Sequence, residues 1–445
     1  MKLWDKGFAV NKLVEQFTVG KDRELDIFLA ESDILGTLAH IRMLESVGLL
    51  ENKELKILVK ELINIHKLVH ESSFVIDDGV EDVHSQVELL LTQKLGDVGK
   101  KVHSGRSRND QVLVDVKLYS RTQLTEIAQS TKDLFDSLIL LSEKFKDCLI
   151  PGYTHLQVAM PSSFGLWFGA YAESLIDDMI LLQAAYKITN QNPLGSAAGY
   201  GSSFPLNRTM TTKLLGFETL SYNVVYAQMG RGKTEKTIAF ALSSIGATLA
   251  KMAMDVCLFM NQNFSFISFP DDLTTGSSIM PHKKNPDVFE LIRAKGNRLQ
   301  ALPNEISMIT TNLPSGYHRD LQLIKESLFP AFDDVKACLA LANMMLQNIS
   351  IKENILDDDK YLYLFSVEEV NREVLAGMPF RDAYKKVGQD IKNGTFKPSK
   401  EIKHTHEGSI GNLCNDLISK KMEDVMHLFQ FKNAEKAIND LLKEL

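Results

Sequence analysis

The chain has 445 residues, of which 44% are hydrophobic and 24% charged, and its formal net charge is -7 at pH 7. This composition is that of a globular protein with a large core, and the negative charge argues against nucleic-acid binding. The N-terminus lacks the apolar segment of a signal peptide, and no apolar run approaches the roughly eighteen residues of a membrane span. Four widely spaced cysteines fit reduced thiols. We therefore expect a cytoplasmic protein that binds neither nucleic acid nor membranes.

Hydrophobic spacing predicts unusually long helices. Apolar residues recur mostly every three or four positions from 110 to 146, and similar stretches cover 162–189, 230–261, 287–313 and 320–348. Helices of this length are typical of a bundle, and no alternation of strands with helices is present, so we expect an all-α fold. The helix in 230–261 is apolar on more than one face, which favours self-association. We expect three helical domains, at residues 1–105, 106–352 and 353–445.

The first two polar loops flank the first long helix. Residues 103–111 place two arginines, two serines and an asparagine before a helix start, where Asn109 or Asp110 can cap. Arginine forks suit carboxylates, so Arg106 and Ser107 are candidate substrate ligands, although a solvated capping loop explains them as well. Residues 151–157 set Thr154 and His155 in a turn. A lone histidine is usually structural, but its pKa suits proton transfer.

A third loop, residues 275–287, combines two serines, two lysines and an expected helix start with Asn285 as the cap and Pro286 at the first helical position. The exposed N–H groups of such a start hold anions. The fourth loop, residues 316–325, is expected to direct Tyr317, Gln322 and Lys325 into one region. Taken singly, each of these loops is equally compatible with a polar surface.

Together the four loops supply the parts of an elimination reaction on a dicarboxylate. Such a reaction needs a base beside a carboxylate, cations for the developing charge and an acid for the departing nitrogen. Ser277, Lys283 and His155 are the candidates for these roles, in that order. A neutral serine is a weak base, so nearby positive charge and N–H groups must activate it.

Two other patterns do not support a site. Residues 230–234 resemble part of a phosphate-binding loop, but Ala227 stands where the first glycine is required. His66 and His70 have helical i, i+4 spacing, yet no third ligand is expected nearby, so an ordinary helix surface is the better interpretation. The pair His404 and His406 is interpreted in the same way, as an exposed loop. We expect no metal and no cofactor.

The chain resembles the fumarase/aspartase superfamily and, within it, the argininosuccinate lyase family. Residues 276–285, Gly-Ser-Ser-Ile-Met-Pro-His-Lys-Lys-Asn, are similar to the superfamily signature, and residues 103–111, 152–157 and 317–322 carry the resemblance to the subfamily. The similarity spans most of residues 20–330. It implies a homotetramer with a twenty-helix core, in which three subunits form each active site. It also implies reversible anti elimination of argininosuccinate to arginine and fumarate without a cofactor.

The resemblance also implies roles for individual residues. Ser277 takes the Cβ proton, His155 assists the leaving guanidinium and Glu290 orients that histidine. Lys283 and Asn285 hold the carboxylate and aci-carboxylate, whereas Lys284 is left to solvent or structure. The implied substrate-binding positions are Asn109, Thr154, Tyr317, Gln322 and Lys325.

Three departures from the family pattern bear on the substrate. Asp22 stands near the position where the family usually has a substrate-binding serine, and no residue of this chain is assigned to the substrate contact of that serine. His282 replaces the glutamine common in this subfamily and is similar to adenylosuccinate lyases. Residues 227–233 replace an expected Ser-Asp-Arg-Asp-like stretch. The alternatives are therefore an adenylosuccinate lyase and a non-catalytic, crystallin-like structural protein.

Overall fold

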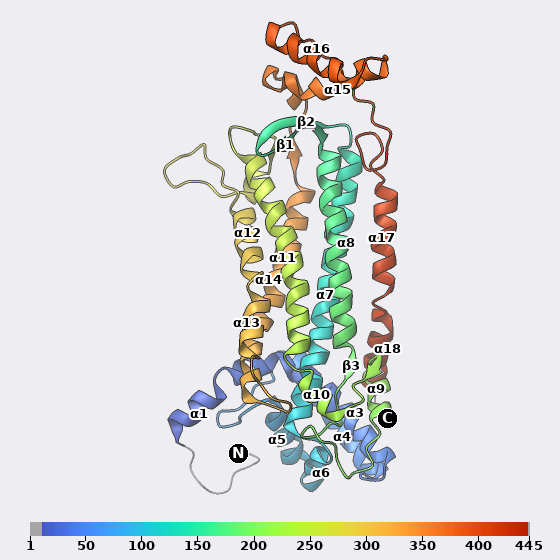
Figure 1. Ribbon diagram of the computed structural model, residues 1–445. Helices are drawn as coiled ribbons and strands as arrows, with labels where there is room; N and C mark the ends of the chain where they lie inside the picture. The colour runs from blue at the N-terminus through green and yellow to red at the C-terminus, as the bar shows by residue number, and fades with distance from the viewer. Residues whose placement is uncertain (1–10, 444–445) are drawn as a thin grey trace.

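A computed structural model describes residues 11–443 of the chain. The molecule is an elongated bundle of long helices with groups of shorter helices at its two ends (Figure 1). This confirms the expected all-α fold and the predicted long helices, whose ends shift by a few residues. The shaft has five helical columns: α7 (Arg108–Lys144), α8 (Phe164–Thr189), α11 (Lys233–Met260), α12 (Asp287–Leu299) followed by α13 (Leu302–Ile309), and α14 (Ile324–Gln347).

The N-terminal helices gather around the lower end of the shaft, where α7, α11 and α14 begin (Figure 1). Two short helices of the middle region, α9 (Arg208–Leu214) and α10 (Val224–Met229), lie at the same end. The N-terminal elements are α1 (Lys12–Val19), α2 (Asp22–Asp26), η1 (Ile27–Leu29), α3 (Ala30–Ser46), α4 (Asn52–His70), α5 (Val83–Leu95), α6 (Asp97–Lys100) and η2 (Lys101–His103).

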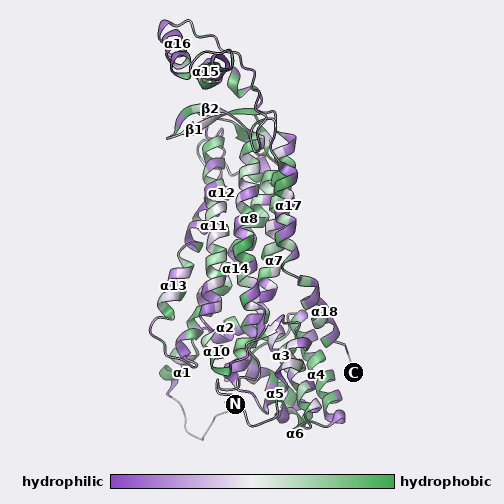
Figure 2. Ribbon diagram, turned by 45° about the vertical axis from the view of Figure 1, so that its right-hand side comes forward, coloured by the Kyte–Doolittle hydropathy of each residue, from purple (hydrophilic) through white to green (hydrophobic). Residues whose placement is uncertain are grey.

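The C-terminal part of the chain first crosses the upper end of the shaft and then returns along it. Helices α15 and α16 stand above the bundle, whereas α17 runs down beside α8 to α18 (Figures 1 and 2). Arg42 on α3 donates to the backbone oxygen of Leu441, at 2.8 Å, so the last residue of α18 lies against the N-terminal helices. The elements are η5 (Ile355–Asp357), η6 (Asp359–Phe365), α15 (Ser366–Leu375), α16 (Phe380–Asn393), α17 (Asn415–His427) and α18 (Phe431–Leu441).

The strands of the described residues form only three two-stranded ribbons. The largest is an antiparallel hairpin of β1 (Leu149–Thr154) and β2 (Gln157–Ser163), which closes the upper end of the shaft between α7 and α8. The others pair β3 (Gln191–Asn192) in parallel with β4 (Thr219–Leu220), and β5 (Ile267–Ser268) in antiparallel with β6 (Ser350–Ile351). The 3₁₀ helices η3 (Asp271–Leu273) and η4 (Arg319–Leu323) precede α12 and α14.

The core fills the space between the helical columns. The apolar residues of α7 that fall at helical spacing are buried, as the sequence predicts, and aromatic rings of α8 and α14 meet them. Figure 2 shows that hydrophobic and hydrophilic stretches both run the length of the shaft. The largest fully buried side chains of the shaft belong to Phe135, Phe164, Phe168, Phe289 and Phe332.

Among the described residues, one helix, α11, is long and apolar enough by length and composition alone to cross a membrane. Of its most apolar stretch, 56% is buried inside the molecule. The helix packs against α8, α12, α13 and α14. Its apolar character therefore fits a helix at the centre of the bundle.

His66 and His70 do have a possible third ligand beside them. Glu31 on α3 places its Oε1 atom 3.5 Å from the Nε2 atoms of both histidines on α4. The expectation of an isolated histidine pair is therefore wrong. The reason is that the third group comes from a neighbouring helix, which spacing within one helix does not reveal.

Two glycines allow α11 and α12 to approach closely. A Cβ atom added to Gly296 would lie 2.4 Å from the carbonyl oxygen of Gly246, and one added to Gly246 would lie 3.0 Å from the carbonyl oxygen of Gly296. Neither contact involves a flexible side chain that could move aside. This crossing therefore depends on the absence of side chains at both positions.

We expect Gly296→Ala to destabilise the fold by about 1–3 kcal/mol, because the added methyl group forces the two backbones apart. Gly388→Ala on α16 is the matched control, since a Cβ atom there meets nothing within 4 Å. That change improves helix propensity by up to about 1 kcal/mol. Thermal unfolding at one protein concentration measures both, and equal melting temperatures for the two variants would contradict the packing described.

A buried group of charges joins the N-terminal helices to α7. His84 on α5 places Nδ1 2.7 Å from Asp33 Oδ1 and 3.4 Å from Asp115 Oδ2, and all three residues are buried. Burial acts to lower the pKa of His84, but the carboxylates of Asp33, Asp115 and Asp82 outweigh it and raise that pKa to about 9. Burial and the Asp33 carboxylate raise the pKa of Asp115. The folded chain therefore holds protons here that the unfolded chain releases.

This group makes stability depend on pH. Because the His84 pKa is raised on folding, its contribution is complete below the unfolded value of about 6.5 and is lost as the pH rises through about 9. The raised pKa of Asp115 acts in the same direction. We expect the melting temperature to fall from pH 6.5 to 9, and His84→Gln to lower it at pH 7 while flattening this fall. The exposed His406→Gln is the control, and an unchanged pH dependence in His84→Gln would refute this account.

Candidate active site

The loop that carries Ser277 lies at the upper end of the shaft, between η3 and α12 (Figure 1). Its two arms are tied together where the N–H of Asn285 donates to the carbonyl of Thr275, at 2.8 Å. The Thr275 hydroxyl also donates to the carboxylate of Asp287, the first residue of α12. These bonds close residues 275–285 into a projecting loop, which we call the serine loop.

The Ser277 hydroxyl oxygen accepts two backbone hydrogen bonds. The N–H groups of Ile279 and Met280 lie 3.3 and 3.2 Å from Oγ. Donors directed at this oxygen favour negative charge on it, and the side chain is only partly buried. The arrangement therefore suits a hydroxyl group that gives up its proton.

Asn285 does not cap α12, contrary to the sequence expectation. The N-cap is Pro286, and the Asn285 amide instead donates back across the loop to the carbonyl of Gly276, at 3.3 Å. Proline at the cap position places the helix start one residue later than expected. Lys284 pairs with Asp271, whereas Lys283 is exposed on the serine loop. The amide of Asn285 thus stabilises the loop rather than the helix.

His155 and Leu156 form the two-residue turn of the β1–β2 hairpin. Their φ angles are 54° and 59°, both in the left-handed region that non-glycine residues rarely adopt. Turns of this kind match the twist of a hairpin but normally use asparagine or glycine. The strained turn exposes His155, with Thr154 beside it at the end of β1. Backbone strain held at an exposed histidine is typical of functional sites.

Glu290 lies in the first turn of α12, below the serine loop, and is exposed. Its carboxylate is 3.9 Å from Nη2 of Arg293, one turn further along the same helix. The upper end of the shaft thus carries Ser277, Lys283, Asn285, Glu290, Thr154 and His155.

The loop of residues 103–111 lies at the opposite end of the shaft and opens α7. Ser107, rather than Asn109 or Asp110, is the N-cap, and the carboxylate of Asp110 accepts the Ser107 N–H at 2.8 Å in a capping box. Asp110 also accepts the N–H groups of Gly195 and Ala197. The expected cap, Asn109 or Asp110, was therefore wrong by two or three residues. Asp110 is instead the third residue of the helix, where its buried carboxylate completes the capping box with Ser107.

Arg106 turns inward from this loop. It is partly buried, and its Nη1 donates to the Thr37 hydroxyl at 2.9 Å. Asn109, in the first turn of α7, is partly exposed. The hydrogen bond to Thr37 ties Arg106, and with it the loop, to α3.

Gln322 and Lys325 hold the N-terminal helices against the start of α14. Gln322 donates to the carbonyls of Thr18 and Val19, at 3.2 and 3.0 Å. The buried Lys325 ammonium lies 2.7 Å from Asp22 and 2.5 Å from Asp26. Burial acts to lower the pKa of Lys325, but both carboxylates raise it. Burial raises the pKa of Asp22 to about 6, against the opposing effect of Lys325.

Arg231 is a residue of this end that the sequence did not single out. It is buried, its guanidinium lies 5.7 Å from the centre of the Tyr317 ring, and Nη2 donates to the Leu321 carbonyl at 3.2 Å. Within residues 11–443, its Nε and Nη1 have no hydrogen-bond partner, although the Glu235 carboxylate is 3.9 Å from Nε. Two features of the sequence lay around this arginine: residues 227–233 departed from the family pattern, and residues 230–234 resembled part of a phosphate-binding loop.

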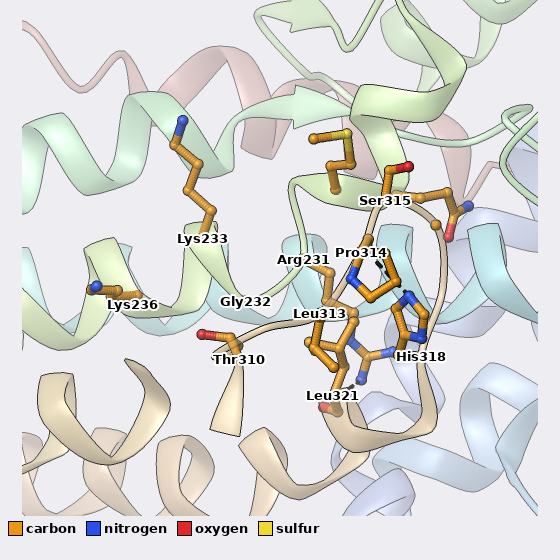
Figure 3. A pocket seen from close by; sticks show the side chains of 13 residues that line it. Arg231, Gly232, Lys233, Lys236, Thr310, Leu313, Pro314, Ser315, His318 and Leu321 are labelled. Atoms are coloured by element: carbon orange, nitrogen blue, oxygen red, sulfur yellow. Dashed lines mark hydrogen bonds between the residues drawn. The ribbon is translucent and has the colours of Figure 1, made fainter. Parts of the chain in front are cut away.

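Arg231 lines a cavity of about 310 Å³ between the start of α11 and the loop before η4. Figure 3 shows Arg231 beside His318, with Lys233 and Lys236 further along the cavity. Four basic side chains and the N-terminal end of α11 surround this space. The cavity is therefore suited to a carboxylate or another anion.

The two sets of candidate residues do not meet within one chain. One set lies at the upper end of α11 and the other at its lower end (Figure 1). Because α11 has 28 residues, these ends are about 42 Å apart. The structure thus places Ser277, Lys283 and Asn285 in one loop, and Tyr317, Gln322 and Lys325 at the same end of the shaft as Asn109, but it keeps the two groups apart.

Comparisons with known proteins identify the family of the chain. The lyase family matches residues 7–301. An argininosuccinate lyase of Bacteroides thetaiotaomicron is 64% identical over 441 residues, which cover 99% of each chain. Another, of Thermotoga neapolitana, is 38% identical over 388 residues, which cover 87% of this chain and 98% of that one.

Solved structures share the fold at lower sequence identity. An EDDS lyase in complex with formate superposes with a TM-score of 0.78 and 20% identity, covering 98% of this chain and 94% of the other. A class II fumarase of Schistosoma mansoni superposes with a TM-score of 0.70 and 16% identity, covering 95% and 94%. The full-length sequence similarity and the family match show that this chain belongs to the argininosuccinate lyase family, and the solved structures share its fold.

Proposed function

We propose that this chain catalyses the reversible anti β-elimination of argininosuccinate to arginine and fumarate. The observation that carries the proposal is identity of 64% over 99% of the chain with a protein named argininosuccinate lyase. The serine loop and the His155 turn supply the chemical groups that such a reaction needs. The reaction needs no cofactor, and we place it in the cytoplasm and in arginine biosynthesis.

The proposed base is Ser277. Its alkoxide takes the proton from Cβ, and the electron pair of that bond moves into the adjacent carboxylate to give an aci-carboxylate. The pair then forms the C=C bond of fumarate as the C–N bond breaks. The departing guanidinium nitrogen takes a proton that His155, oriented by Glu290, donates. The N–H groups of Ile279 and Met280 that contact Ser277 Oγ support this role, because they stabilise negative charge on it.

The charge that develops during elimination must be held by cations and dipoles. We assign Lys283 and Asn285 to the carboxylate and aci-carboxylate, because both lie on the same short loop as Ser277. Asn285 already ties the loop arms together, so its position relative to Ser277 is set before substrate arrives. Lys284 pairs with Asp271, which leaves Lys283 as the lysine assigned to the substrate.

The remaining substrate contacts are assigned to the lower end of the shaft and to Thr154. We propose Asn109, Tyr317, Gln322 and Lys325 as substrate-binding residues, with Arg106 and Ser107 in the loop that positions them. Arg231 is added to this group, because it is buried against the Tyr317 ring and keeps two N–H groups without hydrogen-bond partners in the described chain.

We propose that four copies of the chain assemble so that these groups meet. Five helical columns per chain give a twenty-helix core, and three subunits contribute to each active site. The separation of about 42 Å along α11 supports this, because no amino-acid substrate spans it. Large apolar side chains left exposed on the shaft support it too: Leu140, Ile180, Phe240, Met254, Leu291 and Met308.

We also propose the division into residues 1–105, 106–352 and 353–445 as three domains. The first gathers the N-terminal helices, the second the shaft and the third the helices from α15 onward. The second domain would carry the assembly and most of the chemistry.

A second candidate activity is favoured by one residue. His282 on the serine loop stands where this subfamily commonly has glutamine, and histidine there is similar to adenylosuccinate lyases. A crystallin-like protein without activity is the third alternative. The presence of Ser277, His155, Lys283 and Glu290 argues against it.

A side-by-side assay separates these alternatives. We expect the full-length protein to release fumarate from argininosuccinate, and to do so with a far higher kcat/KM than from adenylosuccinate. The release is followed by the absorbance of fumarate. Activity on the nucleotide alone would reassign the substrate, and no release from either compound by the assembled protein would favour a structural role.

Replacing the base should remove turnover but keep the fold. We expect Ser277→Ala to lower kcat on the order of 10²–10⁴-fold, because general-base catalysis contributes about that much. Ser278→Ala, on the neighbouring exposed serine, is the matched control and should retain most of the activity. Melting temperatures and light scattering would confirm intact assembly of both variants. Near wild-type turnover in Ser277→Ala would remove this residue from the base role.

A further inference from the structure

Three side chains on the outer face of the N-terminal helices converge on one point. His66 and His70 come from successive turns of α4, and Glu31 from the start of α3. The two Nε2 atoms are 3.2 Å apart, and each lies 3.5 Å from Glu31 Oε1. Three atoms with lone pairs thus form a nearly equilateral triangle.

The size of this triangle matches metal coordination. In a tetrahedral site with zinc–nitrogen bonds of about 2.0–2.1 Å, two ligand atoms are separated by about 3.3–3.4 Å. The observed separations of 3.2 and 3.5 Å lie on either side of this value. One ion can therefore reach all three atoms without moving either helix.

Hydrogen bonds among the three groups explain the arrangement less well. One neutral imidazole can donate its Nε2 proton to the other, but the 3.5 Å contacts with the carboxylate are long for hydrogen bonds. A carboxylate and two imidazole nitrogens are donors that zinc accepts.

We propose that Glu31, His66 and His70 bind a first-row divalent cation of the zinc type. The three protein ligands leave a fourth position open to solvent, since the side chains of Glu31 and His70 are 47% and 59% exposed. His66 is 12% exposed and forms the inner wall of the site. The bound ion connects α3 to α4 and is separate from the residues assigned to elimination.

A second cluster of similar composition does not fit a cation. His84 Nδ1 lies 2.7 Å from Asp33 Oδ1, which is a hydrogen-bond distance and too short for two ligands of one ion. This cluster is also fully buried, and its carboxylates already interact with the protonated histidine. The exposed triangle on α3 and α4 is therefore the better metal site of the two.

The experiment is calorimetric titration of the EDTA-treated, full-length protein with zinc chloride in a buffer that does not coordinate metal. We expect one strong site per chain, with micromolar affinity or better. His70→Asn, and separately Glu31→Gln, should weaken zinc binding at least tenfold, because each removes one ligand. These are surface changes, so assembly and lyase turnover without zinc should stay as in the wild-type protein.

The control is the double variant His404→Asn/His406→Asn, which removes the other close histidine pair and should leave the titration unchanged. Zinc should also raise the melting temperature of the wild-type and control proteins but not of His70→Asn. Failure of the wild-type protein to bind zinc below millimolar concentration would overturn the proposal. Equal affinity in the wild-type, His70→Asn and Glu31→Gln proteins would overturn it as well.

Discussion

The length of the helical shaft is the constraint on which the rest of this structure depends. A hydrogen-bonded helix of 28 residues is a stiff spacer of about 42 Å, and α11 places one set of polar loops at each of its ends. The substrate proposed is many times shorter than this spacer. Under the residue roles proposed above, catalysis therefore depends on assembly, because a second copy of the chain would have to bring the opposite end of its shaft to the serine loop.

The two ends of the shaft are built differently. At the lower end, charged groups are buried and paired: Lys325 contacts Asp22 and Asp26, and Asp110 closes the capping box of α7. Such pairs hold side chains in place but are costly to disturb. At the upper end, Ser277 and His155 stand on an exposed loop and a strained turn. The buried pairs suit the lower end to rigid binding of the substrate. The exposed loop and turn suit the upper end to adjustment around the substrate during proton transfer.

Helical periodicity was enough to predict the shaft, because a residue buried in a long bundle repeats its environment every three or four positions. The four polar loops were also evident, since each interrupts that repeat. The sequence did not reveal which residue caps which helix. Ser107 displaced the expected cap of α7 because Asp110 completes a box with it, and Pro286 displaced Asn285 at the start of α12.

Contacts between helices were harder to predict than contacts within one. Glu31 joins His66 and His70 from another helix, and Arg231 reaches Tyr317 from a segment 86 residues earlier in the chain. Spacing rules describe neighbouring residues on one helix and carry no information about contacts between residues of different elements. For the same reason the sequence did not predict that the candidate residues lie at two opposite ends of the shaft. The motifs alone do not show how far apart they are in the folded chain.

The most direct test of the central claim is to mix two inactive variants. Ser277→Ala damages the upper group and Asn109→Ala the lower group, and each pure variant should first be shown to assemble without activity. If the two groups of a site come from different subunits, random reassembly of an equal mixture restores about one quarter of wild-type activity. Because a site built within one chain would contain a defect in every subunit, the absence of any recovery after verified subunit exchange would contradict this account.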